Sequence, residues 1–454
     1  MSIITQIHDS RKNKFRHYAK NTDAAHFLDV LSNKELAQTI QNNTPEHRDR
    51  VYPPLKTLSM FLAQALSEDR SCSKAVIDMI IQSQDDKSKV SPNTSSYCLA
   101  RQKLPLTLLT ELTTEMGELV NDKIPEHWHW YGRRVYLIDG STLTMPDTEE
   151  SQIVFPQHGN QKPGLGFPIC RFLVVTCLAS GVVLNAAISS LKGKGSDEQS
   201  LLRTVLDTFR PGDIVLGDAF FGTFFLLAEM IKRGVDVLFE QFGSRQSKTD
   251  FGTGITLGKK DHLIELLKPK KKPDWMTQKE FDEAPEKIIL REIKSGKKIL
   301  ITTLLSAKEY PKKAIKNLYK ERWHVEVDIR HMKETLGMDV LSCKTPDMCI
   351  KEIWVYFLAN NIIRLLISQA ALYHNLRPRQ LSFKFTVQIW NTYSLLNKLI
   401  DDELFALIAK RKVGARPGRI EPREVKKRPK AYKSLTHPRN EVREEIIKNG
   451  HPKR

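Results

Sequence analysis

The chain has 454 residues, of which 71 are Lys or Arg and 53 are Asp or Glu, so its formal net charge is +18. A hydrophobic share of 40% is that of a globular protein, and the length is enough for about two to four domains. A basic excess of this size indicates a polyanionic partner, most often nucleic acid; the alternative is a soluble protein that is merely basic.

The basic excess is concentrated at the C-terminal end. Residues 410–454 contain 16 Lys or Arg and only 5 Asp or Glu. A basic tail of this kind suits contact with a phosphate backbone, although a solvated tail without a partner has the same composition.

The six cysteines contain no CxxC pair and no zinc-ligand spacing, which favours reduced thiols in a cytoplasmic protein. The N-terminal 20 residues lack the apolar core of a signal peptide. The longest apolar stretch, Trp354–Tyr373, predicts a buried helix and no contact with a membrane, because four polar residues interrupt it: Asn360, Asn361, Arg364 and Gln369.

Residues 1–125 predict a helical N-terminal DNA-binding region. Helical patterns cover residues 55–66, 74–84 and 106–120, and prolines separate them. The segment Asn93–Lys103 is short, polar and basic at its end, which is typical of a recognition helix but also of any exposed helix.

From residue 126 the pattern changes to strands, which predict an α/β fold with a mixed sheet. Their order is that of an RNase H-like core, with a first part at 126–241 and a second part at 298–345. Residues 242–297, lysine-rich with several glycines, predict a β-rich insertion, and residues 346–454 a helical C-terminal region with a basic tail. The elements expected in the first part are strands 134–138, 170–178, 182–191, 213–217 and 235–241, and helices 197–209 and 224–233.

A long helix is expected over Pro311–Leu336, ended by Gly337. At about 100° per residue, four polar side chains lie within an arc of roughly 60°, with Arg330 and Trp323 beside them. An adjoining apolar stripe predicts burial. The polar set is Tyr319, Arg322, Glu326 and Lys333, and the apolar stripe is Leu318, Val325, Ile329, Met332 and Leu336. The alternative is a solvated face on which Glu326 pairs with Arg330.

Two aspartates each follow a short apolar run. Asp139 follows residues 135–138 and Asp218 follows residues 214–217, so both are expected at the ends of core strands. Alone, Asp139 with Gly140 could form a turn, and Asp218 could cap the next helix.

Together with Glu326, the two aspartates form a set of three carboxylates from separate elements. Cleavage of a phosphodiester needs an activated nucleophile, a stabilised leaving oxygen and charge neutralisation, which two divalent ions can supply. Mg²⁺ or Mn²⁺ prefers carboxylate oxygens, and the basic residues beside Glu326 would bind the flanking phosphates.

The spacing Tyr319-x2-Arg322-x3-Glu326-x6-Lys333 resembles the Y-R-E-K signature of the insertion-sequence-4 family of bacterial transposases. Blocks 136–141 and 215–221 are similar to the family's two aspartate blocks. Further similar segments are 164–168, 343–347 and 416–423, so the resemblance covers roughly residues 50–440.

This resemblance implies a DDE transposase. Asp139 would bridge two metal ions, while Asp218 and Glu326 would each bind one. Tyr319, Arg322 and Lys333 would contact the DNA end, with Arg330 and Trp323 beside them on the same helix.

The resemblance also implies partners and products. The protein would bind terminal inverted repeats as a homodimer in a paired-end complex, cut them, and join the 3′ hydroxyls to target DNA. It would act in the bacterial cytoplasm, at the nucleoid. Trp275, the only tryptophan in the insertion, would be the candidate for stacking a flipped base if second-strand cleavage goes through a hairpin.

Two other functions are compatible with part of this pattern. One is a domesticated, catalytically silent DNA-binding protein, against which the presence of all three acids argues. The other is a two-metal nuclease that cuts without joining.

Overall fold

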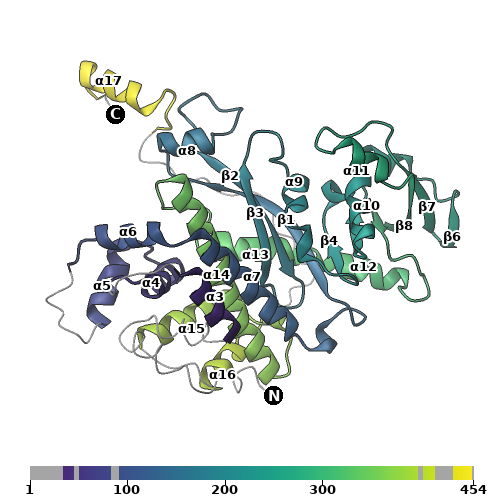
Figure 1. Ribbon diagram of the computed structural model, residues 1–454, viewed down its shortest axis with the longest axis horizontal. Coiled ribbons are helices and arrows are strands. Elements are labelled where there is room, and N and C mark those ends of the chain that lie inside the picture. Colours follow the sequence, from purple (N-terminus) through teal and green to yellow (C-terminus); the bar gives the residue numbers. More distant parts are fainter. Residues whose placement is uncertain (1–33, 45–50, 83–90, 397–401, 415–432, 452–454) are drawn as a thin grey trace.

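The computed structural model describes residues 34–44, 51–82, 91–396, 402–414 and 433–451. The first 33 residues and the basic segment 416–423 therefore lie outside the described residues. Figure 1 shows two groupings of elements: helices α3–α7 and α14–α16 gather at one end, and strands β6–β8 lie at the other. A single sheet connects the two ends.

The sheet has nine strands in the order β3-β2-β1-β4-β5-β9-β8-β7-β6. Strands β1, β4 and β5 are parallel to one another, and the other pairs are antiparallel, so the fold is mixed α/β. The strand bounds are β1 Val135–Thr144, β2 Ile169–Cys177, β3 Val183–Ser190, β4 Ile214–Leu216, β5 Asp236–Glu240, β6 Ile255–Gly258, β7 Asp261–Leu267, β8 Lys287–Ser295 and β9 Lys298–Thr302.

The five strands expected between residues 134 and 241 are all present. A turn that includes Ser180 and Gly181 joins β2 to β3, and Gly181 adopts a φ of +81°, which a residue without a side chain tolerates best. Residues 242–297 contain β6, β7 and β8, and β8 pairs with β9. These strands therefore continue the core sheet instead of forming a separate one.

Helices between the strands pack on the sheet. Helix α10 contacts β5, α9 contacts β2 and β3, and the two short helices α8 and α11 lie in connections. Their bounds are α8 Glu149–Val154, α9 Glu198–Arg203, α10 Phe224–Lys232 and α11 Gln278–Glu283, with short 3₁₀ segments at η3 Glu126–Trp128, η4 Leu206–Thr208, η5 Ala219–Phe221 and η6 Gly243–Lys248.

The long helix expected over residues 311–336 is interrupted. It consists of α12 (Lys312–Glu321), α13 (Trp323–Arg330) and a π-helical turn, η7 (His331–Thr335). The chain tightens at Arg322, whose N–H bonds to the carbonyl three residues earlier, and it widens at η7. The prediction of one uniform helix was therefore wrong, while the apolar stripe is buried and Gly337 ends the segment at φ +84° as expected.

Helix α14 (Pro346–Tyr373) is the centre of the helical end and contacts α4, α7, α15, α16 and β3. By length and composition alone it could cross a membrane, but 94% of its most apolar window is buried inside the protein. The remaining helices are α3 Lys34–Asn43, α4 Pro54–Leu66, α5 Cys72–Gln82, α6 Ser95–Lys103, α7 Leu106–Asp122, α15 Phe383–Leu395, α16 Asp402–Lys410 and α17 Arg439–Asn449, with a 3₁₀ turn at η8 Pro378–Gln380.

The segment considered as a recognition helix forms α6, but it is only partly exposed. Tyr97 and Arg101 are buried, and the Arg101 guanidinium lies over the ring of Phe61 at 4.7 Å. Arg101, the cation near the centre of α6, therefore packs inside the protein. The exposed face of the helix carries Leu99, Gln102 and Lys103.

A buried amide on α14 joins the helical end to the sheet. The Asn361 side chain accepts a hydrogen bond from the Val183 N–H at 2.7 Å and donates to the carbonyls of Val183 and Thr113 at 2.7 and 3.0 Å. It thus satisfies main-chain groups of both β3 and α7.

We expect Asn361→Ala to lower the free energy of unfolding by about 3 kcal/mol, because it leaves buried main-chain groups without partners. Denaturant unfolding measures the loss. Asn360→Ala is the matched control, since Asn360 is equally buried but makes a single main-chain bond of 3.4 Å. Equal losses in the two variants would contradict this role of Asn361.

Candidate active site

Asp139 lies inside β1, not at its end. Strand β1 continues to Thr144, and Asp139 pairs with Val174 of β2. Pairing with β4 stops at Leu137, so Asp139 sits just beyond the point where β1 and β4 separate. The prediction of a strand end at residue 138 was wrong, and so was the alternative of an Asp-Gly turn, because β2 holds β1 extended through Gly140.

Asp218 follows β4 by two residues, on the other side of the same separation. One carboxylate oxygen accepts a hydrogen bond from the Phe220 N–H at 2.8 Å and caps η5. The local capping interpretation is therefore correct, but capping engages only one of the two oxygens. Because β1 and β4 are parallel and their pairing ends at Leu137 and Leu216, Asp139 and Asp218 both lie two residues beyond the last pair, in the same direction along the sheet.

Glu326 reaches this region from α13, which packs against β1. Its carboxylate pairs with Arg322 at 2.8 Å, and the two side chains are 31% and 15% exposed. The alternative pairing with Arg330 does not form, and Arg330 is exposed. Arg322, at the junction of α12 and α13, thus places its guanidinium near Glu326 and Asp139.

Electrostatic proximity relates the helix to both aspartates. The Arg322 guanidinium pairs with Glu326 and lies near Asp139, and the uncharged Tyr319 hydroxyl lies near Arg322 and Asp218. Burial raises the pKa of the Tyr319 hydroxyl above its ordinary value. The structure therefore gathers Asp139, Asp218, Tyr319 and Arg322 around one region, with Glu326 held beside Arg322.

Burial raises the pKa of the Asp139 carboxyl to about 7. The Gly140 N–H, at 2.9 Å, and Arg322 act in the opposite direction, while the nearby carboxylates of Glu198 and Asp218 raise this pKa further. The raised pKa of Asp139 is therefore mainly an effect of burial, with smaller contributions from the neighbouring charges.

Glu198 is an acid of this region that sequence reasoning missed. It is the first residue of α9, after the N-cap Asp197. A Cβ added at Gly140 would lie 2.6 Å from the Glu198 carboxyl carbon, so the glycine allows this side chain to approach β1 beside Asp139. An acidic pair at a helix start is ordinary capping, so the sequence carries no signal that separates Glu198 from a cap.

The other helix residues divide into two groups. The Lys333 ammonium donates to the Thr142 carbonyl at 3.0 Å and to the Ser141 hydroxyl at 3.3 Å, and it pairs with Asp339 at 2.8 Å, so it ties η7 to β1. Trp323 is 48% exposed and Arg330 is also exposed, so they face solvent. One helix face with all six side chains does not form.

Carboxylate oxygens are the donors that a hard divalent cation prefers, and Asp139, Asp218, Glu198 and Glu326 supply them. Within the described part of the chain, no three His, Cys, Asp or Glu side chains are grouped closely enough to hold a metal ion. The acids fit such an ion in chemical kind, because a cation would stabilise the ionised form of Asp139, which burial and the nearby carboxylates of Glu198 and Asp218 disfavour.

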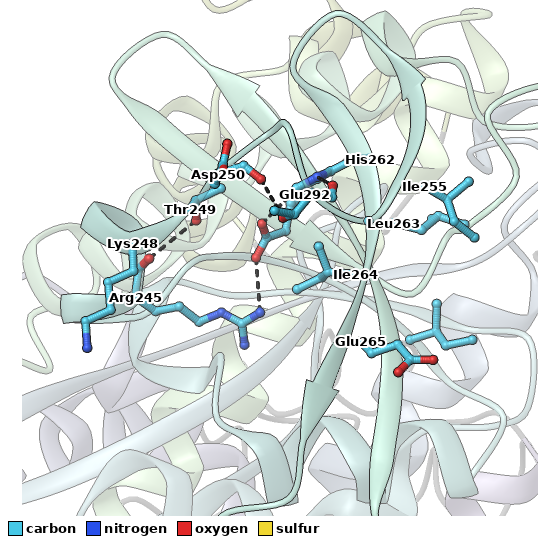
Figure 2. A pocket seen from close by; sticks show the side chains of 13 residues that line it. Arg245, Lys248, Thr249, Asp250, Ile255, His262, Leu263, Ile264, Glu265 and Glu292 are labelled. Atoms are coloured by element: carbon cyan, nitrogen blue, oxygen red, sulfur yellow. Dashed lines mark hydrogen bonds and ion pairs between the residues drawn. The ribbon is translucent and has the colours of Figure 1, made fainter.

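A separate cavity of about 640 Å³ lies in the segment 242–297 (Figure 2). Figure 2 shows Arg245 reaching the buried Glu292, which also bonds to His262. Glu292 accepts a further hydrogen bond from Gln241 at 2.7 Å, so its charge is satisfied within the protein. None of the acids around Asp139 lines this cavity.

Trp275 lies outside this cavity. Its ring faces the Arg203 guanidinium of α9 at 3.9 Å and meets the edge of Phe225 of α10, while 47% of the residue stays exposed. The tryptophan of the insertion is therefore held against the helix that carries Glu198.

We expect Asp139→Asn to stabilise the metal-free protein at high pH. The folded protein keeps a proton on Asp139 up to about pH 7, whereas the unfolded chain releases it near its ordinary pKa of about 3.9. Wild-type stability therefore falls as pH rises from about 4 to about 7, and asparagine cannot ionise. The melting temperature in EDTA should rise in the variant at about pH 8 and hardly change at about pH 4.

The exposed Glu150 of α8 provides the control for the loss of one carboxylate. If the melting temperature of Glu150→Gln rose as much at high pH as that of Asp139→Asn, the rise would reflect the change in net charge and not the burial of Asp139.

Residues 130–362, slightly more than half of the chain, match the family described as "Transposase DDE domain". The chain is 24% identical over 350 residues to "Transposase InsG for insertion sequence element IS4" of Escherichia coli (strain K12), an alignment that covers 76% of each chain. A cryo-EM structure of the piggyBac transposase synaptic complex with hairpin DNA covers 88% of this chain, with a TM-score of 0.43 and 9% identity. On the family match and the relative, the chain belongs to the DDE transposases, within the IS4 family.

Proposed function

We propose that this transposase binds the terminal inverted repeats of an insertion sequence, cleaves the ends by two-metal hydrolysis and transfers the 3′ hydroxyls to target DNA. The observation that carries the proposal is the placement of Asp139 and Asp218 just beyond the last paired residues of β1 and β4, with Arg322, which pairs with Glu326, near Asp139. The InsG relative is named as the transposase of such an element.

The fold we propose for the core is RNase H-like. Strands β3-β2-β1-β4-β5, with β2 antiparallel and β4 and β5 parallel to β1, support it. We propose the division expected from sequence: a helical DNA-binding region at 1–125, core parts at 126–241 and 298–345 separated by an insertion at 242–297, and a helical C-terminal region at 346–454.

Two Mg²⁺ or Mn²⁺ ions would supply an activated nucleophile and a stabilised leaving oxygen. Asp139 would bridge both, while Asp218 and Glu326 would each hold one. For this, Asp139 gives up the proton that burial favours, and Glu326 offers an oxygen besides the one paired with Arg322. Arg322, freed in part from Glu326, is placed to bind a phosphate of the bound strand.

Two sets of side chains would contact the DNA, one near the acids and one facing solvent. Tyr319, Arg322 and Lys333 lie against the sheet near the acids, and Trp323 and Arg330 face outward. The outer residues would meet the duplex beside the cleaved end. We further propose double-stranded DNA ends and target as partners, a homodimer in a paired-end complex, no membrane, and a cytoplasmic, nucleoid-associated location.

We expect Asp218→Ala to abolish cleavage and strand transfer in Mg²⁺ while end binding is retained, because the substitution removes a metal-holding carboxylate that lies apart from the outer DNA-contacting side chains. Gel-shift binding in EDTA and product analysis on labelled ends measure both activities. A wild-type protein that binds ends but neither cuts nor joins them would support the silent DNA-binding alternative, and cut ends without joined products would support a nuclease.

We expect Arg330→Ala to weaken end binding, because one phosphate contact is lost. The slope of the logarithm of the binding constant against the logarithm of the salt concentration should become smaller in magnitude by about one. Fluorescence anisotropy at several salt concentrations measures the slope. The control is Lys313→Ala, an exposed cation at the start of α12. An equal change in both variants would reject a specific contact by Arg330.

A further inference from the structure

Asp328, two residues after Glu326 on α13, is at the centre of a buried ion cluster. Its side chain is completely buried, and those of Arg364 and Arg379 are 3% and 14% exposed. Arg379 binds both carboxylate oxygens of Asp328, at 2.5 and 2.9 Å, and Arg364 binds one at 2.6 Å. This geometry is bidentate, which fixes orientation as well as distance.

Arg379 also hydrogen-bonds to the sheet. It donates to the main-chain carbonyls of Leu178 and Cys177, at 2.7 and 3.0 Å, at the end of β2. Strand β2 pairs with β1 across Asp139. One guanidinium therefore links the helix that carries Glu326 to the strand beside the one that carries Asp139.

The other partner fixes the cluster to the helical end of the protein. Arg364 belongs to α14, donates to the His331 ring nitrogen at 3.2 Å and lies over the Phe383 ring at 4.8 Å. His331 in turn stacks on Phe383 at 4.6 Å. The ion cluster thus connects α13 and η7, through Asp328 and His331, to α14 and α15, through Arg364 and Phe383.

Residues two apart on a helix point in nearly opposite directions, about 200° around the axis. Asp328 is therefore held from the side of α13 away from Glu326. With a helix radius of about 5–6 Å including side chains, a rotation of 20° would move the Glu326 carboxylate by about 2 Å. Metal ligation tolerates only about 0.2 Å. The apolar stripe of α13 has no directional bonds that would prevent such a rotation.

We infer that the Asp328–Arg379 pair is a positioning device that sets the rotation of α13, and hence the direction of Glu326 relative to Asp139. This role rests on the proposed function, in which Glu326 holds a metal ion. Arg379 itself touches neither DNA nor ion in this role and acts through the helix.

Arg379→Gln is the test, with Arg133→Gln as the matched control. Arg133 is 18% exposed, pairs with Asp236 at 2.5 Å and donates to the Gly212 carbonyl at 2.7 Å, so it makes the same kinds of bond. It lies at the opposite edge of the sheet, where β4 and β5 begin. Both variants should lower the melting temperature.

Three measurements separate positioning from general stability. In Arg379→Gln, amides of Trp323–Arg330 should exchange with deuterium faster, Mn²⁺ should bind more weakly in calorimetry without DNA, and the Mn²⁺ concentration for half-maximal cleavage should rise about 10-fold or more. End binding in EDTA should stay unchanged. In Arg133→Gln the metal dependence should be that of the wild type.

The inference is overturned if Arg379→Gln keeps the wild-type metal dependence, or if both variants shift it equally. Should the Gln variant fail to fold, Arg379→Lys, which keeps the charge but not the bidentate geometry, carries the same comparison with a smaller shift. A wild type that binds Mn²⁺ but does not cleave would defeat the proposed function, and the calorimetric comparison would still decide the role of the pair. A wild type without either activity would overturn both.

Discussion

The parallel pairing of β1 with β4 ends after three residues, at Leu137 and Leu216, and the arrangement of the acids depends on this ending. Up to that point the two strands are buried and held by main-chain bonds. Beyond it, β1 continues along β2 while β4 turns into η5. Asp139 and Asp218 therefore follow directly on buried, hydrogen-bonded strand segments, and each side chain is only partly buried.

Like charges in such a place repel one another, so the remaining structure must hold them. Arg322 compensates part of the charge, and Lys333 binds the main chain of β1 just beyond Asp139. On the far side of α13, Asp328 draws two arginines into the interior. In the metal-free protein the buried carboxyl of Asp139 therefore costs stability when it is ionised, an arrangement typical of functional sites.

The elements of the core could be predicted because short strands and helices alternate with clear turn signals. Ser180-Gly181 marks a hairpin, and apolar runs mark the buried strands around it. The break at Arg322 and the π-helical turn at η7 could not be predicted, since no local breaker such as proline or glycine marks either position. For the same reason the uniform helix wheel placed Arg330 and Trp323 with Glu326, whereas the structure turns them to solvent.

The sequence by itself determined the chemical inventory: the acids, the Tyr-Arg-Glu-Lys spacing, the basic balance and the order of strands. Tertiary structure alone decided which charges meet. Glu326 pairs with Arg322 instead of Arg330, Glu198 joins the acids through the space left by Gly140, and Arg379 reaches Asp328 from 51 residues away. Helix periodicity and strand patterning are local properties of the chain, whereas an ion pair between distant residues depends on how the layers pack, and no local pattern encodes that packing.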